Sequence, residues 1–326
     1  MFFKNYKACN SLIGLLILSA LNMSYVFATS VTLDESERFG DTRRGAIPYA
    51  FSTDSLGTVL GIGGFVSGIN QPQSRLVGTA FVSDNDSWLA AVSLGNYRFD
   101  ALDRWFFSLY AQSSHFTDQR FYATVDNRSA DRAGSNDSSK DDFITGVSND
   151  THLEFTVRYP LSIGSAKDDP LTTYRTRRGL LISAPLGGEE WNPLTSGKTI
   201  LGGQYFFRHR DLQQIAQEDL LSVNTNGLSF WLDYNNTDFL PNANSGSRQK
   251  ITLTRDFGWL KSSNSWTNLE LDASEYFNLG TSDWFRHQVL ALDFWTSYTP
   301  DWELDRATGA VDHRPPPEFA AYLGDV

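Results

Sequence analysis

Hydrophobic and polar residues alternate with a period of two along much of the chain, as in β-strands whose two faces differ. In the segment 152–161, Leu153 and Phe155 alternate with His152 and Glu154. The same pattern recurs along the chain, and no fixed-length repeat accompanies it. It predicts about eleven strands, near 57–68, 75–84, 87–99, 104–122, 150–162, 176–185, 198–210, 226–235, 247–259, 265–278 and 286–299.

Alternation of this kind fits two architectures. A soluble sandwich or barrel turns its apolar residues inward, whereas a transmembrane barrel turns them toward lipid and places aromatic residues at both interfaces. Aromatic residues gather at the ends of several predicted strands, as at Trp105, Trp284 and Trp295. The polar faces also carry large charged groups, which a wet lumen tolerates. These features favour an all-β fold, an antiparallel transmembrane β-barrel, with a secreted soluble β-sandwich as the alternative.

The first 28 residues read as a secretory signal peptide. Lys4 and Lys7 precede an apolar run, and Ala28 ends it with the small residue that a cleavage site requires. A membrane anchor is the other interpretation, but Ser19 and Asn22 interrupt the run too early for a span of about 20 apolar residues. We expect export by a cleaved signal peptide, and localisation in the bacterial outer membrane.

This interpretation divides the chain into 1–28 as signal peptide, 29–56 as a short periplasmic N-terminal segment, and 57–326 as a partial barrel domain. The formal net charge of -11 disfavours a nucleic-acid binder, which needs a basic face to contact phosphates. The only cysteine, Cys9, falls within the expected signal peptide, so a disulfide scaffold is excluded.

The segment 227–246 carries a family resemblance. A glycine opens a strand that ends in tyrosine, and an aspartate, a proline and a second glycine follow before the next strand. This resembles the strand–turn–strand unit of the bacterial surface antigen family, the superfamily of BamA, TamA and the two-partner-secretion transporters. Asn235 and Thr237 depart from the Asp and Arg that are usual there. The matching residues are Gly227, Tyr234, Asp238, Pro241 and Gly246.

A second match lies near the end of the chain. In the family, a proline-rich stretch and a Leu-Gly-Gly introduce a loop that folds into the barrel lumen. Here Asp325 replaces the second glycine, and no Arg-Gly pair follows. The resemblance implies about sixteen strands, and we expect a fragment or truncated product that lacks periplasmic POTRA modules. The residues of this pre-loop motif are Arg314, Pro315, Pro316, Leu323 and Gly324.

Candidate chemistry is sparse. The five histidines show no spacing typical of a metal site, and no Gly-x-Ser-x-Gly nucleophile motif occurs. The acidic run 126–150 is better explained as a wet loop than as a calcium site. Gly61, Gly63 and Gly64 favour close strand packing over a phosphate loop. The charged residues that could line a lumen, or be satisfied structurally, are Glu154, Arg158, Asp233, Glu270, Asp272 and Asp293.

We therefore expect no enzyme activity, no cofactor and no metal. The resemblance implies a role in inserting or translocating outer-membrane protein or lipid. A passive outer-membrane pore or structural barrel is the alternative, and a secreted soluble β-sandwich is the third. The expected partners are outer-membrane lipid and other outer-membrane or periplasmic proteins, without nucleic acid.

Overall fold

The structure is a computed structural model that describes residues 29–32, 42–121, 144–178, 180–188, 190–214, 220–285, 287–304, 311–316 and 319. The predicted signal peptide and residues 122–143 lie outside the described residues. The strands are β1 (Thr29–Thr32), β2 (Arg43–Thr53), β3 (Gly57–Ser67), β4 (Arg75–Ser83), β5 (Trp88–Tyr97), β6 (Phe106–Phe121), β7 (Ile144–Pro160), β8 (Thr172–Arg177), β9 (Leu180–Leu181), β10 (Lys198–Gln214), β11 (Leu220–Asn235), β12 (Gly246–Phe257), β13 (Ser265–Gly280), β14 (Gln288–Tyr298), β15 (Glu303–Leu304) and β16 (Val311–Asp312).

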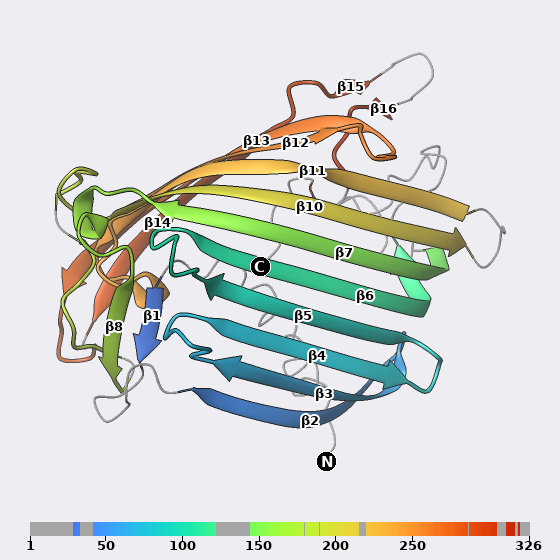
Figure 1. Cartoon of the computed structure of the whole chain (residues 1–326), viewed down its shortest axis with the longest axis horizontal. Coiled ribbons are helices and arrows are strands. Elements are labelled where there is room, and N and C mark those ends of the chain that lie inside the picture. Colours follow the sequence, from blue (N-terminus) through green and yellow to red (C-terminus); the bar gives the residue numbers. More distant parts are fainter. Residues whose placement is uncertain are drawn as a thin grey trace.

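Eleven of these strands form one antiparallel sheet, in the order β14-β13-β12-β11-β10-β7-β6-β5-β4-β3-β2. Neighbours in the sheet are neighbours in sequence, except that β7 pairs directly with β10. The sheet curls, so that β14 passes behind the strands at the front of Figure 1. Among the described residues, β2 and β14 do not pair with each other. The all-β prediction is therefore confirmed, and the sheet is open over these residues.

The predicted strands were right in ten cases and wrong in one. The stretch 176–185 is not part of the large sheet. It contributes to β8 and β9, which form a separate three-stranded sheet with β1. The large sheet also begins earlier than predicted, because β2 lies inside the segment 29–56 that we expected to precede the strands. A proline at position 48 breaks the apolar pattern there, as is tolerated in an edge strand.

The two faces of the sheet differ in chemistry. On β11, Phe230 and Leu232 are 54% and 42% exposed, whereas Ser229 and Asp233, which flank them, are buried. The strands β7 and β12 show the same inversion, with exposed leucines and buried threonines or arginine. We call the face that carries Asp233 the inner face and the opposite one the outer face. A soluble sheet buries its apolar face, so this sheet has the reverse arrangement.

The end of the sheet where β7 leads toward β10 carries a small cap, at the left of Figure 1. Its core consists of Tyr174, Leu186 and Phe239, with the Tyr174 and Phe239 rings 5.0 Å apart. Burial and then the nearby Asp238 raise the pKa of the Tyr174 hydroxyl.

Two cations fix the loop that follows β7. Arg104 donates hydrogen bonds to the carbonyl oxygens of Pro160, Ala166 and Lys167, and Lys198 Nζ donates to that of Pro170 at 2.8 Å. Cationic donors satisfy several loop carbonyls at once, which holds an irregular segment in place. Over the described part of the chain, no helix has the length and apolar character needed to span a membrane.

Candidate functional site

The structure places all six predicted lumen-facing residues on the inner face. Glu154 and Arg158 lie four residues apart on β7, so their side chains share one face of the sheet. Residues paired across neighbouring strands also point to the same side. Asp233 on β11 pairs with Lys250 on β12, and Lys250 pairs with Asp272 on β13, so all three lie on this face. Glu270 and Asp293 share it. The inner face therefore gathers charges from strands distant in sequence, as the alternation predicted.

The strongest contact among them joins Asp233 and Arg248. The Arg248 guanidinium donates two hydrogen bonds to the Asp233 carboxylate, both 3.0 Å long. The Asp233 side chain is only 5% exposed, so its charge is compensated mainly by this partner. Across the face, Arg158 is buried and donates to the Ser108 hydroxyl at 2.6 Å. Burial of both acid and base makes this region costly to disturb.

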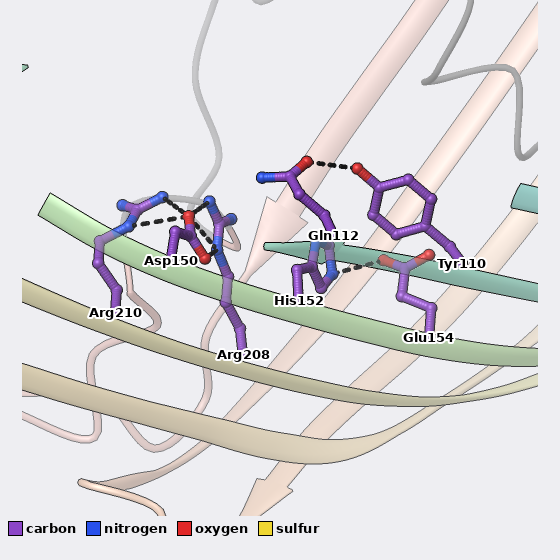
Figure 2. A network of polar contacts seen from close by, with 7 residues as sticks. All are labelled: Tyr110, Gln112, Asp150, His152, Glu154, Arg208 and Arg210. Carbon is purple, nitrogen blue, oxygen red and sulfur yellow. Dashed lines mark hydrogen bonds and ion pairs between the residues drawn. The ribbon is translucent and has the colours of Figure 1, made fainter. Parts of the chain in front are cut away.

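A second charged cluster lies on β7 and β10, and Figure 2 shows it from close by. Arg208 and Arg210 both donate to the Asp150 carboxylate, at 3.0 and 3.3 Å from their Nε atoms. Two residues after Asp150 on β7, His152 Nε2 lies 3.0 Å from the Glu154 carboxylate. Two guanidinium groups therefore compensate the charge of the Asp150 carboxylate locally.

The residues beside this cluster extend it into a network. Tyr110 donates from its hydroxyl to the Gln112 side-chain oxygen, and its ring packs on His152 with centroids 5.2 Å apart (Figure 2). Gln204 on β10 donates to Glu154 at 2.8 Å. These contacts join β6, β7 and β10 through their inward side chains.

An aromatic contact spans four strands beside the charged clusters. Phe206, Gly227, Asp256 and Trp266 stand in one row across β10–β13. The rings of Phe206 and Trp266 lie 6.1 Å apart over this row. A Cβ at Gly227 would come 2.8 Å from the Phe206 ring, so glycine leaves the room that the ring occupies. The inner face is thus concave enough for side chains three strands apart to meet.

Phe319 completes this aromatic contact. Its ring lies 4.7 Å from that of Phe206 and 5.1 Å from that of Trp266. Just before it in sequence, His313 Nδ1 bonds the Ser265 carbonyl oxygen at 2.7 Å. His313 therefore contacts the start of β13, and Phe319 contacts aromatic rings of the inner face.

The segment 227–246 covers the end of β11, a turn and the start of β12. Asp238 organises the turn, because its Oδ1 accepts backbone N–H bonds from Phe239 and Asn244, both at 2.8 Å. Pro241 lies in a short 3-10 helix, and Gly246 has a φ of +92°, a value that favours glycine. Tyr234 is buried and its hydroxyl donates to the Ser196 carbonyl oxygen at 3.3 Å.

The pre-loop motif is described in part. The Arg314 guanidinium lies 5.9 Å from the centre of the Trp302 ring, and Pro315 is buried. Pro316 accepts a backbone hydrogen bond from Phe319 at 2.9 Å. Leu323 and Gly324 lie outside the described residues.

Sequence reasoning missed the Asp150 cluster and the Phe206 row. Asp150 follows the alternation of β7, and Phe206, Arg208 and Arg210 follow that of β10. The sequence could therefore have predicted that these side chains lie on the polar face of their strands. Their contact depends on β7 pairing with β10, which the wrongly predicted strand 176–185 concealed. Comparisons with known protein families, with curated proteins and with solved structures gave no match.

Proposed function

We propose that this chain forms the wall of an outer-membrane β-barrel whose inner face lines a polar passage. The observation that carries the proposal is the inversion of the sheet. On β12, Leu253 is 46% exposed on the outer face, while Thr252 on the inner face is 9% exposed. An outward apolar band with a polar interior is the arrangement of transmembrane barrels.

Aromatic residues at both ends of the outer face support the same proposal. Trp105 and Phe99 lie near the end where β6 begins, and Phe257 and Trp259 near the end where β12 finishes. Such rings sit at the headgroup level, where one side is apolar and the other is wet. The apolar residues between the two ends would then contact lipid.

Partition and a point substitution test the membrane proposal. The protein should be recovered in the membrane fraction and require detergent for extraction. Leu253→Arg should destabilise the protein in bilayers by about 2–4 kcal/mol if that position is near the midplane. Leu260→Arg, in the turn after β12, is the matched control and should have little effect. Recovery in the soluble periplasm would overturn the proposal.

Ion selectivity tests the passage. Asp150→Asn removes the carboxylate that Arg208 and Arg210 share, so the inner face gains positive charge and should favour anions. The reversal potential in planar bilayers should shift accordingly. Asp54→Asn, in the turn between β2 and β3, makes the same charge change off the strands and should leave selectivity unaltered. No conductance from either protein would count against the passage.

A second candidate function is the insertion or translocation of outer-membrane protein or lipid, as the surface antigen resemblance implies. The contact of Phe319 with the inner face favours it, because the family's pre-loop segment leads into the lumen. Depletion of the protein followed by measurement of outer-membrane protein levels tests this candidate. An unchanged profile would leave the passive passage as the function.

A further inference from the structure

The loop between β9 and β10 crosses onto the outer face of the large sheet at its capped end. Trp191 Nε1 donates a 2.9 Å hydrogen bond to the Gln249 side-chain oxygen, and the Trp191 ring meets that of Tyr234 edge-on, with centroids 5.6 Å apart. Tyr234 on β11 pairs with Gln249 on β12. Both lie on the outer face, because they continue the alternation of Leu232 and Ile251. Trp191 therefore lies on the outer side of the sheet, although it belongs to no strand.

This loop covers one aromatic ring of the outer face and presents another. Tyr234 is only 6% exposed, and its hydroxyl donates to the Ser196 carbonyl oxygen in the loop. Trp191 is 60% exposed, and Leu194 in the same loop is 69% exposed. Large apolar side chains that gather on one exposed surface mark a contact with a partner. The loop thus extends the exposed apolar surface of β11 and β12 beyond the strands.

Hydrogen bonds hold the loop in this position. The backbone N–H groups of Thr195 and Ser196 both donate to the Asn192 carbonyl oxygen, at 3.1 and 2.9 Å, which closes a turn around Leu194. The Ser196 hydroxyl donates to the Asn236 side-chain oxygen at 2.6 Å, which ties the turn to the end of β11. Leu194 is therefore exposed by a turn with fixed hydrogen bonds.

The chemistry of segment 190–196 favours lipid as the partner, at the boundary between headgroups and acyl chains. Gln249 satisfies the indole N–H of Trp191 while most of the ring stays exposed, which suits a surface that is apolar on one side and wet on the other. Glu190 is the only charged residue of the segment, and it is exposed. Anionic headgroups repel an acidic side chain, so apolar contact and not charge attraction accounts for the site.

We propose that segment 190–196 is a membrane anchor, in which Trp191 and Leu194 enter the headgroup boundary of an uncharged or zwitterionic phospholipid surface. The inference rests on the proposed membrane location of the sheet. It goes further because the anchor belongs to a loop and not to a crossing strand. The same loop carries Leu186 of the cap core, so lipid contact here ties the cap to the membrane.

A fluorophore on a single cysteine tests the depth of the loop, with the full chain reconstituted into phosphatidylcholine vesicles. Cys9→Ser removes the native thiol, and Leu194→Cys introduces the labelling site. Leu253→Cys on the outer face of β12 is the membrane reference, and Asp54→Cys in the turn between β2 and β3 is the water reference. Lipid nitroxides near the headgroup or deep in the acyl chain quench at their own depth, and iodide quenches from water.

The Leu194→Cys label should be quenched more by the shallow nitroxide than by the deep one, and the Leu253→Cys label should show the reverse order. The Asp54→Cys label should be quenched by iodide alone. Quenching by iodide alone at Leu194→Cys, with lipid quenching retained at Leu253→Cys, would overturn the anchor and leave the membrane proposal standing. Absence of lipid quenching at both positions would overturn both proposals.

Two further substitutions test the ring itself. Trp191→Ala should remove most of the lipid quenching of the Leu194→Cys label, whereas Trp191→Tyr keeps an amphipathic ring and should retain it. Equal quenching in the three proteins would overturn the role of Trp191. Anionic phosphatidylglycerol in the vesicles should not increase the quenching, and an increase would overturn the assignment to apolar contact.

Discussion

The two halves of the large sheet fill the same inner face in different ways. The inward positions of β2–β5 carry no charge except at two strand ends, Arg43 on β2 and Arg75 on β4. Aromatic rings cover the uncharged positions. The rings of Phe51 and Phe81 lie 6.4 Å apart, and those of Phe81 and Phe116 lie 6.5 Å apart. From β7 onward, the inward positions also hold ion pairs, beside the ring contact of Phe206 with Trp266.

The difference shows that one binary pattern permits two kinds of packing. In the first half, Tyr49 lies over Gly61, so the missing side chain gives the ring its place. In the second half, Arg248 and Asp233 satisfy each other. Ring packing depends on fit and is insensitive to salt, whereas buried charge depends on having both partners present. The following substitutions test this contrast, beginning with the largest expected effect.

Asp233→Ala should have the largest effect. It leaves the guanidinium of Arg248 on the inner face without its carboxylate, and breaking a buried pair costs about 3–5 kcal/mol. The measurement is the free energy of unfolding from urea titration in micelles. The double substitution Asp233→Leu with Arg248→Met removes both charges and should recover most of the loss. A double variant as unstable as the single one would refute the role of charge compensation.

Gly61→Leu should have the next largest effect, in the aromatic half. A Cβ at this position would lie 2.4 Å from the Tyr49 ring, and overpacking costs about 1–3 kcal/mol. Gly63→Ala is the control, since its Cβ would meet no atom nearer than 3.9 Å. Tyr49→Ala combined with Gly61→Leu should restore part of the lost stability. Equal losses at Gly61 and Gly63 would argue against ring coverage.

Tyr49→Phe should have a smaller effect. It keeps the ring over Gly61 and removes the 2.8 Å hydrogen bond with the Thr79 hydroxyl, which contributes about 0.5–1.5 kcal/mol. Thermal unfolding at low and high salt provides the measurement. The loss should be the same at both salt concentrations, whereas Asp150→Asn in the charged half should respond to salt. A salt-dependent loss of stability for Tyr49→Phe would contradict the proposed difference between the two halves of the sheet.

The contact of His313 should show a small pH dependence. The backbone carbonyl of Ser265, with the nearby carboxylates of Asp312 and Asp301, raises the pKa of His313 above its ordinary 6.5. A raised pKa means that the contact is fully favoured below that ordinary value and weakens as pH rises past the raised one. Amide exchange of residues 311–316 should therefore increase with pH beyond its intrinsic rate.

His313→Gln provides the control for that measurement, because glutamine keeps a donor and does not titrate. Its amide exchange should show only the intrinsic dependence on pH. An identical excess in the wild-type and substituted proteins would assign the effect to another group.

Periodicity predicted most of the fold because it is a local signal. Ten strands of the large sheet and the face of Glu154, Asp233 and Asp272 followed from alternation alone. β2 was not predicted because it contains Pro48, which has no backbone N–H to donate to a neighbouring strand. Only the edge position of β2 makes this loss harmless. Edge position is a property of the whole sheet, so no local pattern contains it.

The inner-face contacts were less predictable for a related reason. Asp150 meets Arg208 only because β8 and β9 leave the sheet and bring β7 beside β10. Arg178, with a φ of 52°, turns the chain between β8 and β9 within the stretch predicted as one strand. A strand predicted between β7 and β10 hides their direct pairing, although the later pairings and the faces stay correct.

The parallel pair of β1 and β8 has a consequence for the order of folding. Every strand of the large sheet pairs with sequence neighbours except at the β7–β10 junction, so that sheet can grow hairpin by hairpin. Thr29, by contrast, pairs with Thr172, and the strands β2 to β7 lie between these two residues in the sequence. Contacts of such long sequence separation are slow to close. The N-terminal strand is therefore expected to join last, as a late kinetic phase after the eleven strands have assembled.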